Sequence, residues 1–145
     1  MAQFHFSLEK VLRWRSLELA AEEAKLEQLL REQLRLQTLR AGLSAEKSNL
    51  DRSLATLTDL SGADLRAVNA YSLHLKRQSE DLARQVAQCD RDLSEQKRKF
   101  RAAKQRFRLL EELKRRKLEL WRQEQARELE SLATESFLAI WNRER

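Results

Sequence analysis

The chain has 145 residues, of which 36% are charged and 6% aromatic, and it contains two glycines and no proline. So few turn-forming residues exclude a fold built from many short elements, and the dominance of charged residues, alanine and leucine is typical of a coiled coil. The net charge of +6 comes from one stretch, because residues 96–123 hold 12 basic and 3 acidic residues.

The first predicted helix is marked by a ladder of leucines at Leu29, Leu36, Leu43, Leu50 and Leu57. Residues seven apart return to the same stripe of an α-helix, and a stripe that narrow is buried only against a nearly parallel helix. The ladder therefore predicts a long helix over about residues 5–60 with a helical partner.

A chain reversal is predicted where the ladder stops, at about residues 61–63. Gly62 permits the turn, Ser61 can cap the free amides of a new helix, and Asp64 suits the positive first turn of that helix. A second helix is then expected over about residues 64–141.

The second helix carries the matching apolar stripe. Steps of four and three residues lead from Leu65 through Leu75, Leu82, Cys89 and Leu93. The predicted fold is all-α, with two long helices in an antiparallel coiled-coil hairpin and a longer second helix. Residues whose numbers add to about 122 should face each other, and Cys89 should be a small buried residue of the seam.

Catalysis and metal binding have no candidate residues. His5 and His74 are far apart in such a hairpin, Cys89 has no second cysteine, and no glycine-rich loop occurs. Two paired helices also enclose no volume in which a substrate could be desolvated. We therefore expect no enzymatic activity, no cofactor and no metal site.

No apolar run reaches the roughly 20 residues of a membrane span, and no signal peptide is apparent, so we expect a soluble cytoplasmic protein without direct membrane insertion.

The basic stretch from Lys97 to Arg122 predicts an interaction surface. Nucleic acid, a membrane surface and an acidic protein all fit such charge. A basic-zipper protein that reads DNA carries its basic region before the leucine repeat, whereas in this chain the basic stretch follows the leucine ladder.

Four aromatics should gather at the open end of the hairpin, either to close the coil or to anchor a partner: Phe4, Phe6, Trp14 and Trp121.

The seam fades after Leu110, where the first helix no longer supplies a partner. Apolar residues continue on a different stripe, at Leu118, Trp121, Leu129, Leu132, Phe137, Ile140 and Trp141. This amphipathic tail has no predicted partner within the chain, which favours an external one.

Three motifs follow one another along the chain. They are Phe4-x-Phe6-x-Leu8-Glu9-x-Val11-Leu12-x-x-Arg15, then Asp64-Leu65 with Tyr71-x-x-x-Leu75, and Leu110-Glu111-x-Leu113 with Trp121 and Arg127-Glu128. Together they resemble the FliJ family of flagellar type III export proteins, over nearly the whole chain. The resemblance implies a coiled coil similar to the central stalk of rotary ATPases, located in the cytoplasm and peripheral to the inner membrane at the flagellar base. It implies docking into the hexameric export ATPase, coupling to an export-gate membrane protein, and an escort role for export chaperones.

The resemblance also assigns residues to two surfaces. The ATPase-ring docking surface would comprise Phe6, Leu8, Leu12, Arg13, Arg15, Leu110 and Arg115. The export-gate contact would comprise Tyr71, His74, Gln78, Asp81 and Gln85. No nucleic acid is expected on this interpretation. The alternatives are the equivalent stalk of a virulence injectisome and a nucleic-acid-binding coiled coil that uses residues 97–122.

Overall fold

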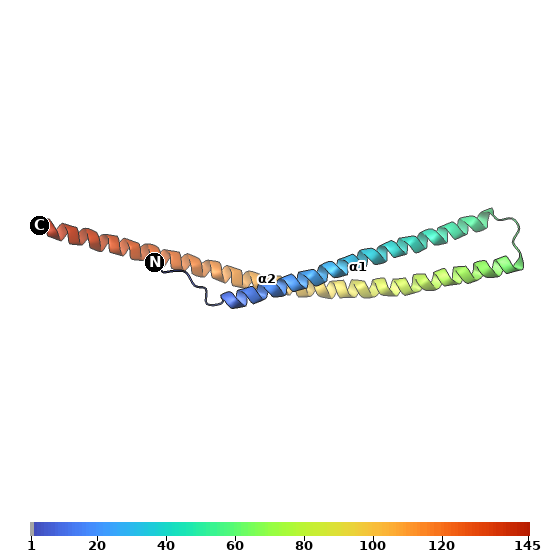
Figure 1. Ribbon diagram of the computed structural model, residues 1–145, viewed down its shortest axis with the longest axis horizontal. Helices are drawn as coiled ribbons and strands as arrows, with labels where there is room; N and C mark the ends of the chain where they lie inside the picture. Colours follow the sequence, from blue (N-terminus) through green and yellow to red (C-terminus); the bar gives the residue numbers. More distant parts are fainter. Residues whose placement is uncertain (1) are drawn as a thin grey trace. The chain divides into compact units, whose positions relative to one another are not determined.

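The computed structural model describes residues 2–145, which form two long α-helices. Helix α1 spans Glu9–Thr56 (48 residues) and helix α2 spans Gly62–Arg143 (82 residues). The two helices pack against each other in opposite directions, as Figure 1 shows, and residues 2–145 contain no strand. The predicted all-α antiparallel hairpin with a longer second helix is confirmed.

The helix ends differ from the predicted ones. Helix α1 begins at Glu9 instead of near residue 5 and ends at Thr56 instead of near residue 60, so the connecting loop has five residues. The Thr56 hydroxyl donates to the Ser53 carbonyl at 2.9 Å, and the residues that follow include threonine, aspartate and serine, which favour turns over helix. The weak helix formers after residue 56 thus end α1 before the glycine is reached.

Helix α2 begins with a capping box. The Ser61 hydroxyl accepts the Asp64 N–H at 3.2 Å, and an Asp64 carboxylate oxygen accepts the Ser61 N–H at 3.2 Å. Hydrogen bonding of the Asp64 carboxylate to the Ser61 side chain and to the Ser61 N–H favours the ionised form and lowers the pKa of Asp64. The cap that the sequence predicted at Ser61 is present.

The chain divides into two compact units, and each helix passes through both of them. We call residues 2–20 and 101–145 the terminal unit, and residues 21–100 the turn unit. Among the described residues, neither helix is both long enough and apolar enough to cross a membrane.

The core of the turn unit is a thin seam between the helices. Leu36 of α1 is only 2% exposed and packs with Leu82, Cys89 and Leu93 of α2. Desolvation raises the pKa of the buried Cys89 thiol, which suits the predicted role of a small core residue.

Polar contacts between the helices fix their register. In the turn unit, the Tyr71 hydroxyl donates to Glu46 at 3.3 Å, Gln33 donates to Asp90 at 3.3 Å, and Gln96 donates to the Glu22 carbonyl at 3.1 Å. Gln96 also bonds the Glu22 carboxylate, and this bond lowers the pKa of Glu22. The numbers of these paired residues add to between 117 and 123, close to the predicted register.

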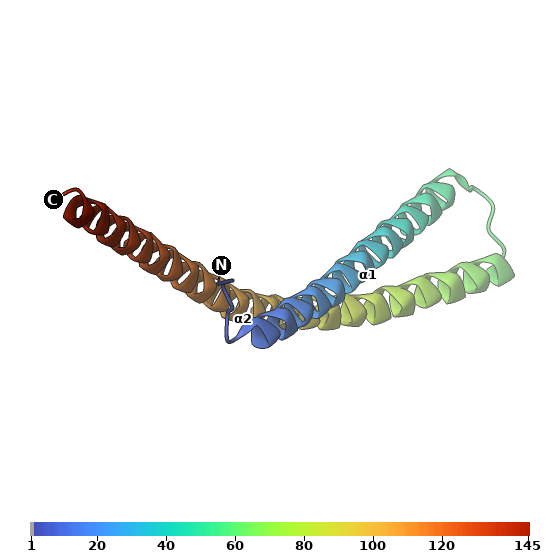
Figure 2. The same cartoon turned by 60° about the vertical axis from the view of Figure 1, so that its left-hand side comes forward.

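Within the turn unit the helices move apart toward the loop, as Figures 1 and 2 both show. A groove of about 520 Å³ lies between them here, lined among others by Leu43, Leu50, Leu75 and Leu82. The seam is therefore tightest around Leu36 and loosest beside the loop.

Candidate interaction surface

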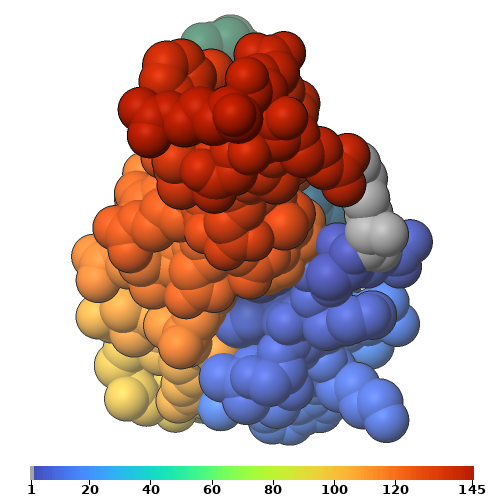
Figure 3. All heavy atoms as spheres, turned by 90° about the vertical axis from the view of Figure 1, so that its left-hand side faces the viewer, coloured from blue at the N-terminus to red at the C-terminus, as the bar shows by residue number. Residues whose placement is uncertain are grey.

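The N-terminal segment of the terminal unit is tied to α2 by aromatic and ionic contacts. The Phe4 and Trp121 rings lie 6.0 Å apart at 55°, and Phe6 and Leu12 are buried. The Lys114 ammonium lies 2.9 Å from the Glu9 carboxylate. Figure 3 shows the N-terminal residues lying against α2 at this end. Three of the four predicted aromatics thus close the seam.

Glu18 links the two helices of the terminal unit. Its carboxylate accepts hydrogen bonds from Arg15 of α1 at 2.8 Å and from Arg106 of α2 at 3.1 Å. The sequence analysis did not single out Glu18, although its position three residues after Arg15 is a common ion-pair spacing in helices. The bridge orients Arg15 for a second contact.

Trp14 is the aromatic of the predicted group that remains available to a partner. Its side chain is 56% exposed, and the Arg15 guanidinium lies 4.5 Å from its ring centroid in a cation–π contact. Val11 and Leu17, three residues away on either side, are also exposed. This part of α1 presents an apolar surface centred on a tryptophan that is held by an arginine.

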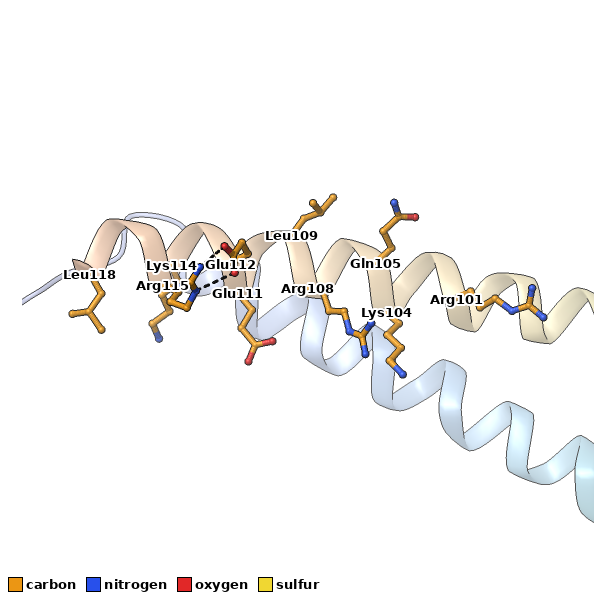
Figure 4. Close-up of a pocket in the computed structure, with 10 residues that line it drawn as sticks. All are labelled: Arg101, Lys104, Gln105, Arg108, Leu109, Glu111, Glu112, Lys114, Arg115 and Leu118. Carbon is orange, nitrogen blue, oxygen red and sulfur yellow. Dashed lines mark hydrogen bonds and ion pairs between the residues drawn. The ribbon is translucent and has the colours of Figure 1, made fainter. Parts of the chain in front are cut away.

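A cationic groove of about 1120 Å³ runs along α2 in the same unit. Arg101 and Arg108 are exposed there and have no ion pair among residues 2–145. Figure 4 shows the side chains of Lys104 and Arg108 directed to the same side of the helix. The groove is lined by Arg101, Lys104, Gln105, Arg108, Leu109, Glu111, Glu112, Lys114, Arg115 and Leu118.

Glu112 is the anchored acid of this groove. It accepts two hydrogen bonds from Arg115, at 2.6 and 3.1 Å, and one from Arg116 at 3.2 Å. The bond from Arg115 and the added contact with Arg116 lower the pKa of Glu112 to about 2, so its carboxylate is ionised throughout the neutral range. In return, the pKa of Arg115 is raised, and its guanidinium is fixed on the helix surface.

Four exposed arginines share one stripe of α2. Arg101, Arg108, Arg115 and Arg122 are each seven residues apart, so they repeat at about 10.5 Å along the helix. The sequence analysis identified the basic stretch as a whole and missed this order, although the seven-residue spacing is visible in the sequence.

The predicted ring-docking residues divide into two groups. Phe6 and Leu12 are buried in the seam and Leu110 is half-buried, so these three pack the unit together. Arg15 is half-buried in its bridge to Glu18. The residues that reach the surface are Leu8, Arg13 and Arg115.

The predicted export-gate residues all lie on α2 in the turn unit. They are exposed and share one face, because they are spaced alternately three and four residues apart: Tyr71, His74, Gln78, Asp81 and Gln85. The negative charge of Glu46 raises the pKa of the Tyr71 hydroxyl that bonds it, and Asp81 lies 3.6 Å from Arg84. The structure therefore brings these five residues together.

No group of three His, Cys, Asp or Glu side chains that could hold a metal ion occurs in the described part of the chain. Searches against protein-family models, curated proteins and solved structures find no match to this chain. Its function is therefore inferred from its own residues and their arrangement.

Proposed function

We propose that the protein is a non-enzymatic stalk and chaperone escort of a flagellar type III export apparatus, which docks into the hexameric export ATPase through its terminal unit. The observation that carries the proposal is the exposed Trp14, held by Arg15, in a unit whose other helix carries the arginine stripe. Together these give one unit an aromatic anchor and a cationic surface.

The chemistry of this surface favours an acidic protein cavity as its partner. Tryptophan and arginine dominate the energetics of protein interfaces, and complementary charge speeds docking. The surface is held in place by the buried Phe6 and Leu12 and by the Glu18 bridge. Little conformational entropy is therefore lost on binding. A rigid anchor of this kind suits a stalk inside a ring.

We assign coupling to the membrane export gate to the turn unit. The five-residue face that begins at Tyr71 is exposed, contains one acidic residue, Asp81, and no lysine or arginine, and is separate in sequence from the docking residues. On this proposal the protein works in the cytoplasm at the inner membrane, with one unit serving the ATPase and the other serving the gate.

The test is to mix the protein with the hexameric export ATPase of the same organism and to measure ATP turnover and co-sedimentation. We expect stimulation by the wild-type chain, and its loss in Trp14→Ala and in Arg13→Glu/Arg108→Glu. The matched controls are Leu34→Ala, which truncates an exposed leucine of the turn unit, and the double reversal Arg52→Glu/Arg77→Glu in the same unit.

The proposal would be refuted if the wild-type chain neither stimulated ATP turnover nor co-sedimented with the ATPase. Equal loss in the terminal-unit variants and in their turn-unit controls would contradict docking through the terminal unit, because the effect would then not depend on which unit is changed. Circular dichroism shows whether each variant keeps its helices.

The same chemistry leaves two alternatives. An injectisome stalk would stimulate the injectisome ATPase in place of the flagellar one. A nucleic-acid-binding coiled coil would use the arginine stripe, because cations such as Arg101 and Arg108, which have no ion pair among residues 2–145, neutralise phosphates. Tight binding to DNA or RNA, with an affinity that falls steeply with salt and is lost in Arg13→Glu/Arg108→Glu, would favour this second alternative.

A further inference from the structure

The last twenty residues of the chain form an uncovered amphipathic helix. Every residue from Ala126 to Arg145 is exposed, and in Figures 1 and 2 no second helix runs beside this part of α2 among the residues described. The helix nevertheless continues to Arg143, and the Glu144 N–H still donates to the Ile140 carbonyl at 3.2 Å. Leu129 and Phe137 are each 64% exposed. An apolar face of this length calls for a partner.

One stripe of this helix has the same spacing in both directions. Its seven members, in order, are Arg122, Ala126, Leu129, Ala133, Phe137, Ile140 and Glu144. They are separated by four, three and four residues, and then again by four, three and four. Each set of eleven residues makes about three helical turns, so the stripe stays in line along a nearly straight helix. The stripe is therefore symmetric about Ala133.

This symmetry pairs complementary residues when a second copy runs antiparallel. With Ala133 against its own equivalent, Arg122 meets Glu144, which carries the opposite charge. Ala126 meets Ile140, so a small side chain faces a large one, and Leu129 meets Phe137. The small Ala133 at the centre lets the two backbones approach closely, and each copy offers the same surface to the other, as a two-fold interface requires.

We propose that residues 122–144 pair with the same segment of a second copy in an antiparallel, two-fold symmetric helix dimer. The charges distinguish this partner from others. A parallel pair would set Arg122 against Arg122 and Glu144 against Glu144. Residues 124–145 hold five acidic and three basic residues, so an anionic lipid surface would not attract them. The proposal does not depend on the function proposed above.

Sedimentation equilibrium of the full chain tests the dimer. We expect the wild-type chain to dimerise and Phe137→Lys to remain monomeric, because the lysine would meet Leu129 of the partner. Leu138→Lys is the matched control, since Leu138 is 53% exposed and lies about 100° around the helix from Phe137, outside the stripe, and this variant should still dimerise. A wild-type monomer at every concentration, or dissociation by Leu138→Lys as strong as by Phe137→Lys, would overturn the proposal.

Charge exchange tests the pairing of the two ends. Arg122→Glu and Glu144→Arg should each weaken the dimer about tenfold, because each dimer contains two such pairs. An equimolar mixture of the two variants should form a heterodimer of wild-type strength, since both pairs are then again of opposite charge. No gain on mixing would exclude the antiparallel register.

Cross-linking tests the direction, in a chain carrying Cys89→Ser. Ala133→Cys should form a disulfide-linked dimer on mild oxidation, because position 133 faces itself. Ala126→Cys should not do so alone, but should cross-link to a chain carrying Ile140→Cys. Efficient self-cross-linking of Ala126→Cys would indicate a parallel pair and overturn the proposal.

Discussion

Replacing Leu36 with alanine measures how much of the stability depends on the seam of the turn unit. Leu36 is 2% exposed and packs against Leu82, Cys89 and Leu93 of α2. The change removes three carbon groups, which at about 0.8 kcal/mol each amount to about 2.4 kcal/mol of burial. A seam between two helices can partly collapse into the space, so the cavity adds little, and the free energy of unfolding should fall by about 3 kcal/mol.

Urea unfolding followed by far-UV circular dichroism gives this value from the shift of the midpoint. The matched control is Leu34→Ala, which makes the same chemical change two residues away, at a side chain 65% exposed, and should change the free energy by less than about 0.5 kcal/mol. The reasoning would be refuted by similar losses in the two variants, because burial would then not be what distinguishes them.

Three further changes probe polar contacts. Gln96→Glu places a carboxylate against that of Glu22 and should lower the free energy of unfolding by about 1–3 kcal/mol at pH 7, more than Gln96→Leu does, as urea unfolding would show. Ser61→Ala removes one half of the capping box with Asp64 and should cost about 1 kcal/mol in thermal unfolding, whereas Ser61→Asn should cost less. The contribution of ionised Glu112 to the free energy of unfolding should be complete above its pKa in the unfolded chain, about 4.3, and should be lost as the pH falls through about 2. An NMR titration of the Glu112 carboxyl carbon with a midpoint near about 4 would contradict this prediction.

The fold was predictable because one signal dominates the sequence. The leucine ladder, the matching stripe of the second half and the cap at Ser61 all indicate the same hairpin, and side chains such as Leu36 and Cys89 are buried as the stripe requires. The helix ends were less predictable. They depend on local competition, such as the bond from the Thr56 hydroxyl to the backbone, which leaves no trace in hydrophobic spacing.

The interaction surface was only partly predictable, since spacing does not say which apolar residues stay outside. Phe6 and Leu8 are both large apolar residues that precede α1, yet Phe6 is buried and Leu8 is exposed. That difference arises from how the N-terminal segment lies against α2. The selection of Trp14 as the exposed anchor depends on the same three-dimensional contacts.

The antiparallel pairing sets an order for folding. Glu46 and Tyr71 close a short loop, whereas Glu9 must find Lys114, more than a hundred residues later in the chain. Closing the longer loop costs more conformational entropy. The two helices should therefore pair first in the turn unit and then in the terminal unit. During synthesis at 5–20 residues per second, the start of α1 waits roughly 5 to 20 seconds for its partner residues to be made. In a growing chain the surface centred on Trp14 is thus the last part of the hairpin to take shape.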